Sequence, residues 1–186
     1  MRPIVRMKRS RLLVSGVALG ATILGSTGQT TQATYAAAAP PTWVTTQGKV
    51  VHLTLIAGYN NENSGFNFDG AAHGRMTSTV PLGATVDVTF KNSARGEQHN
   101  VVVIPYTKTL PASSSSPAFP GAATPTPKFT RGSAPQTTGA ARQFSFTAGK
   151  TGRYTLICGI AGHAIAGMWD TFVVSSTAKT ASITFK

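Results

Sequence analysis

No stretch of this chain after Lys49 keeps the apolar spacing of an amphipathic helix over several turns, and this feature restricts the fold most. Instead, short runs rich in β-branched and aromatic residues are separated by Gly, Pro and Asn. In the clearest run, polar residues alternate with Ala84, Val86, Val88 and Phe90. This alternation predicts a strand with one buried face and one face in solvent.

Further runs of the same kind predict seven more strands, at Val50–Ile56, Arg75–Val80, Asn100–Ile104, Gln143–Phe146, Arg153–Cys158, Asp170–Val174 and Ser182–Phe185. Short strands with turn residues between them are typical of two packed sheets. We therefore expect an all-β domain, an antiparallel sandwich with Greek-key connections.

A long segment without apolar alternation, Pro105–Ala141, interrupts this pattern. It contains seven Pro residues and the serine run Ser113–Ser116. Proline disfavours both helices and central strands, and loops of this length are often functional. We expect residues 105–141 to be a loop insertion, either a tolerated surface segment or a docking segment for a partner.

The N-terminal region has the three-part pattern of a secretory signal. A basic head is followed by an uncharged apolar run, Leu12–Gly25, and then by a polar, Ala-rich stretch. We expect residues 1–38 to be a signal peptide or an N-terminal membrane anchor, with residues 12–28 as the tether if the segment is retained. Residues 39–48 would then be a linker and residues 49–186 the domain, located outside the cytoplasm in the periplasm or on the outer face of the cell membrane.

The charge balance of the chain excludes some classes of partner. The net charge is +12, and without residues 1–38 it is +7, from 12 Lys plus Arg against 5 Asp plus Glu. These cations are scattered and form no run that could follow a phosphate backbone, so we expect no nucleic acid partner. A chain with so few carboxylates loses few ion pairs in acid, which is compatible with an acidic exterior.

The segment from Cys158 to Trp169 carries the most chemical information. Cys158, His163 and Met168 follow one another at five-residue intervals, between one predicted strand and the next. The intervening Gly and Ala residues allow the loop to fold back, so the three side chains can converge. Upstream, His99 precedes an apolar run and could bring a second imidazole to the same end of the sandwich. Two His, one Cys and a weak axial Met are the ligands of a blue copper electron-transfer site.

Other interpretations of these residue types are weaker. His52 or His73 could in principle take the place of His99, but His52 lies within a strand run and His73 in a Gly-rich turn. Structural zinc rarely uses Met as a ligand. A Cys–His nucleophile would need an acid to orient the imidazole, and the loop offers none.

Three motifs together resemble the sulfocyanin family of cupredoxins, with a loop spacing similar to that of rusticyanin. They are the Cys-x4-His-x4-Met loop followed by Trp169, the pair His99–Asn100, and the string Phe66–Gly70. The resemblance covers residues 48–175. Asp69 stands in that string where the family pattern has Asn.

The resemblance implies a Greek-key β-sandwich that shuttles single electrons. Its copper ligands would be His99, Cys158, His163 and Met168, and Asn100 would brace the loop that holds Cys158 and damp electron donation from its sulfur. It also implies redox partner proteins, a cytochrome or a terminal oxidase.

From the residues and the resemblance we expect an exported, monomeric copper protein that passes single electrons between respiratory-chain partners. Small uncharged residues around His163 favour brief docking, and an apolar thioether-containing site favours Cu(I) and a high reduction potential. We expect no enzyme activity, since the sequence offers no acid–base pair or second metal cluster. Two alternatives remain: a copper-holding or copper-delivery protein with the same ligands, and a metal-free binding module.

Overall fold

The computed structural model describes residues 43–94, 96–124 and 141–186. These residues belong to one folding unit, Ala39–Lys186. The expected export segment, residues 1–38 with the tether 12–28, lies outside the described residues. Among those that are described, no helix has the length and apolar content needed to cross a bilayer.

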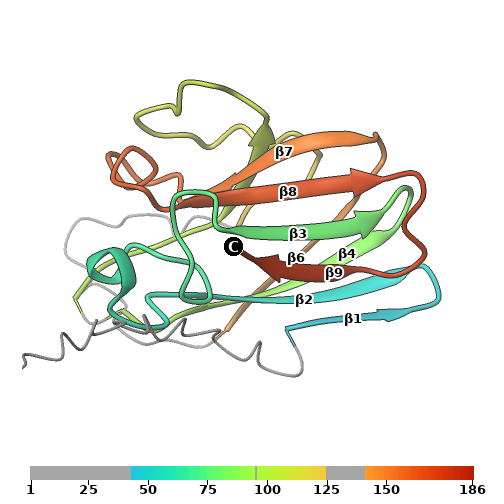
Figure 1. The fold of residues 1–186 in the computed structure, drawn as a ribbon, viewed down its shortest axis with the longest axis horizontal. Helices are drawn as coiled ribbons and strands as arrows, with labels where there is room; N and C mark the ends of the chain where they lie inside the picture. Colours follow the sequence, from blue (N-terminus) through green and yellow to red (C-terminus); the bar gives the residue numbers. More distant parts are fainter. Residues whose placement is uncertain (1–42, 95, 125–140) are drawn as a thin grey trace, which may run out of the picture. The chain divides into compact units, whose positions relative to one another are not determined.

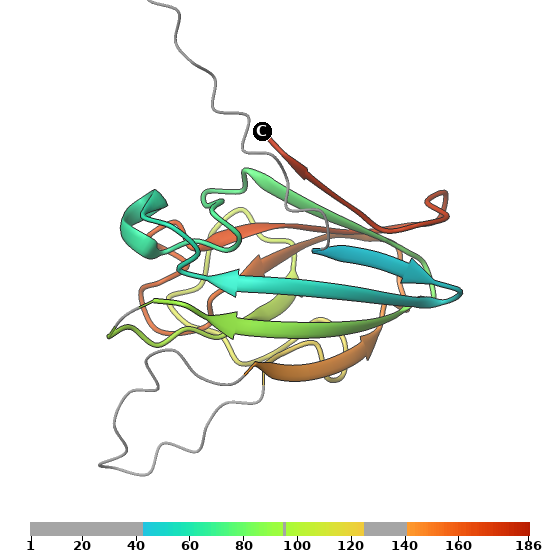
Figure 2. The ribbon, with the colours of Figure 1, turned by 90° about the horizontal axis from the view of Figure 1, so that it is seen from below.

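Two β-sheets form the domain (Figure 1). The first sheet contains, in spatial order, β1 (Val44–Gln47), β2 (Val50–Ala57), β4 (Thr85–Asn92) and β6 (Arg142–Thr147). The second contains β5 (Val102–Pro105), β7 (Gly152–Ile157), β8 (Trp169–Ser175), β3 (Met76–Pro81) and β9 (Ser182–Phe185). From β2 to β7 the chain changes sheet at every step, as it does in Greek-key sandwiches. Figure 2, seen from below, shows the strands of the first sheet lying side by side.

The strand pairing is mixed. Strands β2 and β4 pair parallel, as do β3 and β8, whereas the other pairings of the described strands are antiparallel. The expectation of an antiparallel sandwich is therefore wrong for these two pairs. Alternation along a strand indicates which side chains face the core, but it does not identify the neighbouring strand.

The predicted buried face of β4 and the residue before it is confirmed. Ala84, Val86, Val88 and Phe90 are at most 3% exposed and pack in the core between the sheets. Each fully buried Val or Phe side chain contributes about 1.5–3 kcal/mol through removal of apolar surface from water. The alternating apolar residues of β4 thus form part of the core against which the loops at the ends of the sandwich pack.

Two segments differ from the expected organisation. Strand β1 lies within residues 39–48, expected to be a linker, because four residues with Val44 as the only apolar one give too little alternation to recognise. The described first part of the expected insertion, residues 106–124, returns along β5: the Val103 amide donates to Ala122 O at 3.0 Å, and Phe119 is buried against Phe146 and Tyr154. Residues 125–140 lie outside the described part of the chain.

Two buried carboxyl groups lie beside the loops at one end of the sandwich. Asp69 Oδ1 accepts from the Ile56 amide at 2.7 Å, and Asp170 Oδ1 accepts from the Met76 amide at 2.8 Å. The second oxygen of each carboxyl group is buried without a hydrogen-bond partner among the described residues. Burial raises the pKa of each group to about 8, so both are neutral in acid.

The raised pKa of Asp69 predicts that the free energy of unfolding falls as pH rises. Its pKa is raised from 3.8 to about 8 in the folded protein, which therefore binds this proton more tightly than the unfolded chain does. The free energy of unfolding consequently decreases as pH rises from about 4 to about 8. Asp69→Asn keeps an oxygen for the Ile56 amide and cannot ionise. We expect the variant to lose less stability across this interval than the wild type, measured as urea midpoints; parallel curves would contradict the prediction.

Candidate metal centre

The predicted ligands come from two segments that strand pairing brings together. The ligand loop, residues 158–168, connects β7 to β8. His99 lies just before β5, which pairs with β7 in the register Val102 opposite Ile157. Continued by one residue, this register places Val101 opposite Cys158, the first residue after β7, so His99 lies two residues further along at the end of the sandwich where β8 begins.

Three donor atoms form a small triangle. His163 Nδ1 lies 3.2 Å from His99 Nδ1 and 3.4 Å from Cys158 Sγ, and His99 Nδ1 lies 3.9 Å from the same sulfur. Metal bonds of about 2.0–2.3 Å directed to the corners of a triangle separate the ligand atoms by roughly 3.5 Å. The three side chains therefore already have the spacing that one trigonally bound metal ion requires.

Met168 closes the ligand loop. Its amide donates to His163 O at 3.0 Å, and its carbonyl accepts from the Cys158 amide at 3.1 Å. The side chains of Met168 and Cys158 are both fully buried and belong to the same apolar cluster. The loop thus returns the thioether residue to the strand end that carries the thiol.

The other two histidines lie away from this triangle. His52 is exposed on the outer face of β2, where its Nδ1 is 3.8 Å from Asp87 Oδ2. His73 is exposed in the turn before β3, and its amide donates to Gly167 O at 2.8 Å. Among the described residues, the cluster of His, Cys, Asp or Glu able to hold a metal ion consists of His99, Cys158 and His163.

Sequence reasoning missed the residues that cover and support the centre. The Phe66 ring meets both imidazoles edge to face, with centroids 4.8 Å from His163 and 5.8 Å from His99. Behind the loop, the Ser114 amide donates to Gly159 O at 3.1 Å and the Gly162 amide donates to Ala112 O at 2.8 Å. Phe66 belongs to a recognised motif, so it could have been suggested as part of the site. Backbone contacts from the Pro- and Ser-rich segment leave no signal in the sequence.

Asn100 makes the bracing contact that the family resemblance implies. Its Oδ1 accepts from the Gly159 amide at 2.6 Å and from the Cys158 thiol at 3.6 Å. All three residues are buried, so these groups have no water with which to replace the contact. The side chain of Asn100 thereby joins the His99 segment to the ligand loop.

Burial changes the proton affinities of the donor groups in opposite directions. It lowers the pKa of His99 to about 4, with the nearby His163 as a second cause, and it also lowers the pKa of His163. Neutral imidazoles can bind a metal without first losing a proton. Burial raises the pKa of the Cys158 thiol, partly offset by hydrogen bonds involving Asn100 and Ile160. Metal binding therefore has to displace the thiol proton.

Comparison with known proteins identifies the family. The model of the sulfocyanin (SoxE) domain matches residues 38–184. The chain belongs to the sulfocyanin family. Sulfocyanin of Sulfolobus acidocaldarius is 31% identical over 134 residues, which cover 69% of this chain and 65% of that protein. The match thus spans just under two thirds of that relative's length.

Solved structures similar to this sulfocyanin-family chain include two kinds of protein. Rusticyanin from Thiobacillus ferrooxidans is 26% identical, with 72% of this chain and 86% of that chain covered and a TM-score of 0.41. Auracyanin A from Chloroflexus aurantiacus, a "blue" copper protein, is 21% identical, with 68% and 99% covered and a TM-score of 0.47.

Sulfocyanins are cupredoxins, blue copper proteins with one copper ion as cofactor, and the described centre fits this ion. A thiol and a thioether suit Cu(I), whereas two imidazoles suit both copper oxidation states. The centre offers the first set in Cys158 and Met168 and the second in His99 and His163. The triangle of donor atoms agrees with the trigonal geometry of such sites. The buried apolar residues around it keep water away from the donor atoms.

The Asn100 contact predicts a stability difference in the metal-free protein. Asn100→Ala leaves the buried Gly159 amide without its acceptor, which costs about 1–3 kcal/mol. Asn92→Ala is the matched control, since Asn92 also bonds backbone groups, at Glu97 and Ala94, but at the more exposed end of β4. We expect a lower urea midpoint for Asn100→Ala than for Asn92→Ala. Equal losses would show that the link between the two segments is not important for stability.

Proposed function

We propose that this chain is an exported, monomeric carrier of single electrons that serves respiratory-chain partners outside the cytoplasm. Its copper ligands would be His99, Cys158, His163 and Met168. The observation that carries the proposal is the triangle of donor atoms, because two imidazole nitrogens and a thiol sulfur from distant segments lie within 3.9 Å of one another. Residues 1–38 would direct export or anchor the chain, with residues 39–186 as the copper domain.

Bound copper supplies the one-electron couple. The protein's part is to hold the donor groups in one arrangement and to keep water away. Cys158 and Met168 are fully buried, and His99 is 9% exposed. Two backbone hydrogen bonds with Ala112 and Ser114, together with the Asn100 contact, hold the ligand loop. These restraints limit how far the donor groups can shift when the charge at the centre changes.

His163 offers the path to a partner. Its side chain is half-buried, whereas the other predicted ligands are buried. The exposed residues of the loop near it are uncharged, and Ile165 is 61% exposed. This apolar patch, made by Ala161, Gly162, Ile165 and Ala166, lets a partner approach the imidazole closely without displacing tightly held water. A small apolar contact also permits rapid release, which turnover requires.

The copper-holding alternative uses the same ligands but fits the burial less well. Delivery requires that an incoming ligand reach the metal while the first ligands leave. The Cys158 sulfur lies in the apolar core, and the Phe66 ring packs edge to face against both imidazoles. This enclosure favours a resident metal ion.

The ligand assignment predicts a colour. Cu(II) added to the purified domain should give the intense visible band of a copper–thiolate site, because Cys158 supplies the sulfur. Cys158→Ser and His99→Ala should abolish or strongly weaken this band. His52→Ala is the control, since His52 lies on the outer face of β2 and should leave the spectrum unchanged. A wild-type protein that stays colourless would favour a metal-free binding module.

If the apolar patch around His163 is the docking surface, a charge placed there should slow electron self-exchange between two copies more than the same charge placed elsewhere. Ile165→Lys puts two cations face to face when the patches meet, so the self-exchange rate should fall by about tenfold or more at low salt. Leu82→Lys is the matched control, because Leu82 is also exposed but lies beyond β3 at the opposite end of the sandwich. The visible spectrum should be the same in both variants. Slow wild-type self-exchange with fast copper transfer to a metal-free acceptor would favour the copper-holding function.

A further inference from the structure

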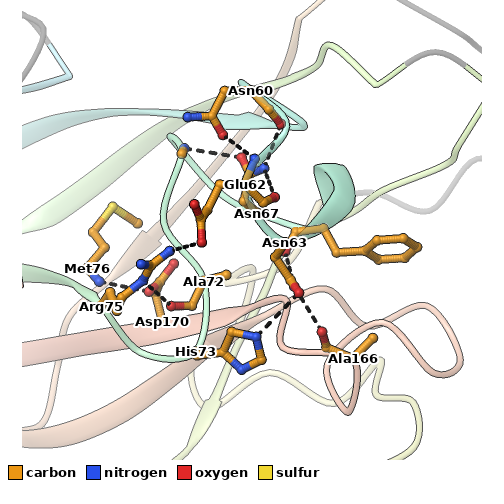
Figure 3. A network of polar contacts seen from close by, with 12 residues as sticks. Asn60, Glu62, Asn63, Asn67, Ala72, His73, Arg75, Met76, Ala166 and Asp170 are labelled. Carbon is orange, nitrogen blue, oxygen red and sulfur yellow. Dashed lines mark hydrogen bonds and ion pairs between the residues drawn. The ribbon is translucent and has the colours of Figure 1, made fainter. Parts of the chain in front are cut away.

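A short turn before β3 touches the ligand loop through one side chain. The 3₁₀ turn η1 spans Glu62–Gly65. Within it, Asn63 Nδ2 donates to Phe66 O at 2.8 Å and to Ala166 O in the ligand loop at 2.9 Å, while Asn63 Oδ1 lies 3.3 Å from His73 Nε2 (Figure 3). Asn63 is not one of the predicted ligands, and it is more than ninety residues from the ligand loop in sequence.

The backbone of this turn has an unusual conformation. Asn63 has φ 50° and ψ 40°, and Ser64 has φ 56° and ψ 30°. Both residues are thus left-handed, a region that Asn tolerates better than most other side chains. Two successive non-glycine residues in this conformation require contacts that hold them there.

Other contacts pin the turn from its far side. Asn67 is fully buried, and its Nδ2 donates to Asn60 O at 2.9 Å and to Glu62 O at 2.7 Å. Glu62 also forms an ion pair with Arg75 (Figure 3). Because these contacts fix the backbone of the turn, the Asn63 side chain holds the ligand loop at a defined position through its hydrogen bond to Ala166 O.

The position of Phe66 depends directly on this turn. The Phe66 amide donates to Asn63 O at 3.0 Å, and the Phe66 carbonyl accepts from the Asn63 side chain. Both contacts orient the residue whose ring covers His99 and His163 edge to face. A turn that opened would move this ring off the imidazoles.

The 63–73 segment also holds the end of the ligand loop, at the two residues before Met168. Ala166 O accepts from Asn63, and Gly167 O accepts from the His73 amide. Gly167 has φ +101°, and a Cβ at this position would collide with the His73 ring. The loop therefore approaches the 63–73 segment so closely that glycine is required there.

We propose that Asn63 is a positioning residue for the copper centre. Its side chain is a latch between the Phe66 ring and the ligand loop, and it keeps the Cys158 sulfur and the imidazoles out of water. It acts through Phe66 and Ala166 and touches none of the predicted ligands by a hydrogen bond. For copper itself this inference rests on the proposed function, but the latch is a property of the metal-free protein as well.

The latch is tested first without metal, by the rate at which a soluble aromatic disulfide reagent labels Cys158, the only thiol of the chain. Asn63→Asp keeps the size of the side chain but turns an oxygen toward two carbonyl oxygens. Asn63→Gly removes both hydrogen bonds while easing the positive φ. With two hydrogen bonds lost, labelling should be about tenfold faster or more in each variant.

Asn60→Asp is the matched control. It introduces the same charge in the same loop, and Asn60 uses Oδ1 to accept from the Glu62 amide, an interaction that Asp retains. Its labelling rate should stay near that of the wild type. Labelling is measured well below the urea transition of each variant, so global unfolding does not contribute. Equal rates in the Asn63 and Asn60 variants would overturn the latch.

The second readout uses the copper-loaded protein. Water admitted to the centre stabilises the more charged Cu(II) state, so both Asn63 variants should have a lower reduction potential than the wild type, and Asn60→Asp should not. An unchanged potential in the Asn63 variants would contradict the latch. A wild type that takes up no copper would defeat the proposed function instead, while the labelling rates would still decide the latch.

Discussion

One buried hydrogen bond, from the Gly159 amide to Asn100 Oδ1, joins the two segments on which the centre depends. The segments are 59 residues apart in the chain, and each carries part of the donor set. Strand pairing between β5 and β7 brings them to the same end of the sandwich, but pairing alone fixes only backbones. The amide of Asn100 turns this proximity into a definite spacing between an imidazole nitrogen and a sulfur. Because the bond is buried, water cannot take its place, and its geometry is kept.

The ligand loop is held from two sides by parts of the chain that do not contribute ligands. Residues 112–114 hold its first half from behind, through the carbonyl of Ala112 and the amide of Ser114. The 63–73 segment holds its second half, through Asn63 and His73. A loop of small residues such as this one would be mobile alone, since Gly and Ala restrict the backbone little. Its order comes from these neighbours, which explains how a flexible composition is compatible with a fixed centre.

The sequence predicts the parts of this structure that depend on periodicity and on residue type. Alternation along Ala84–Phe90 correctly gives the buried face of β4. The spacing of Cys158, His163 and Met168 predicts the ligand loop, and the structure brings the Cys158 sulfur and the His163 imidazole of this loop together. Parallel pairing of β2 with β4 is not predictable from alternation, because it depends on which strands become neighbours. The roles of Ala112 and Ser114 are carried by backbone atoms, which are the same in every residue. Asn63 acts through a positive φ and a contact about a hundred residues away, and neither has a local signature.

The parallel pairing of β3 with β8 has a consequence for the order in which the molecule is assembled. Residues in contact across this pair are about ninety positions apart, so the second sheet cannot form from hairpins alone, although the successive strands β7 and β8 do pair. Folds dominated by such distant contacts acquire their native pairing slowly and late. The ligand loop lies directly before β8, and its seat is therefore finished only when nearly the whole polypeptide has been made and docked. The donor groups can therefore reach their native spacing around a cofactor only after this late pairing has formed.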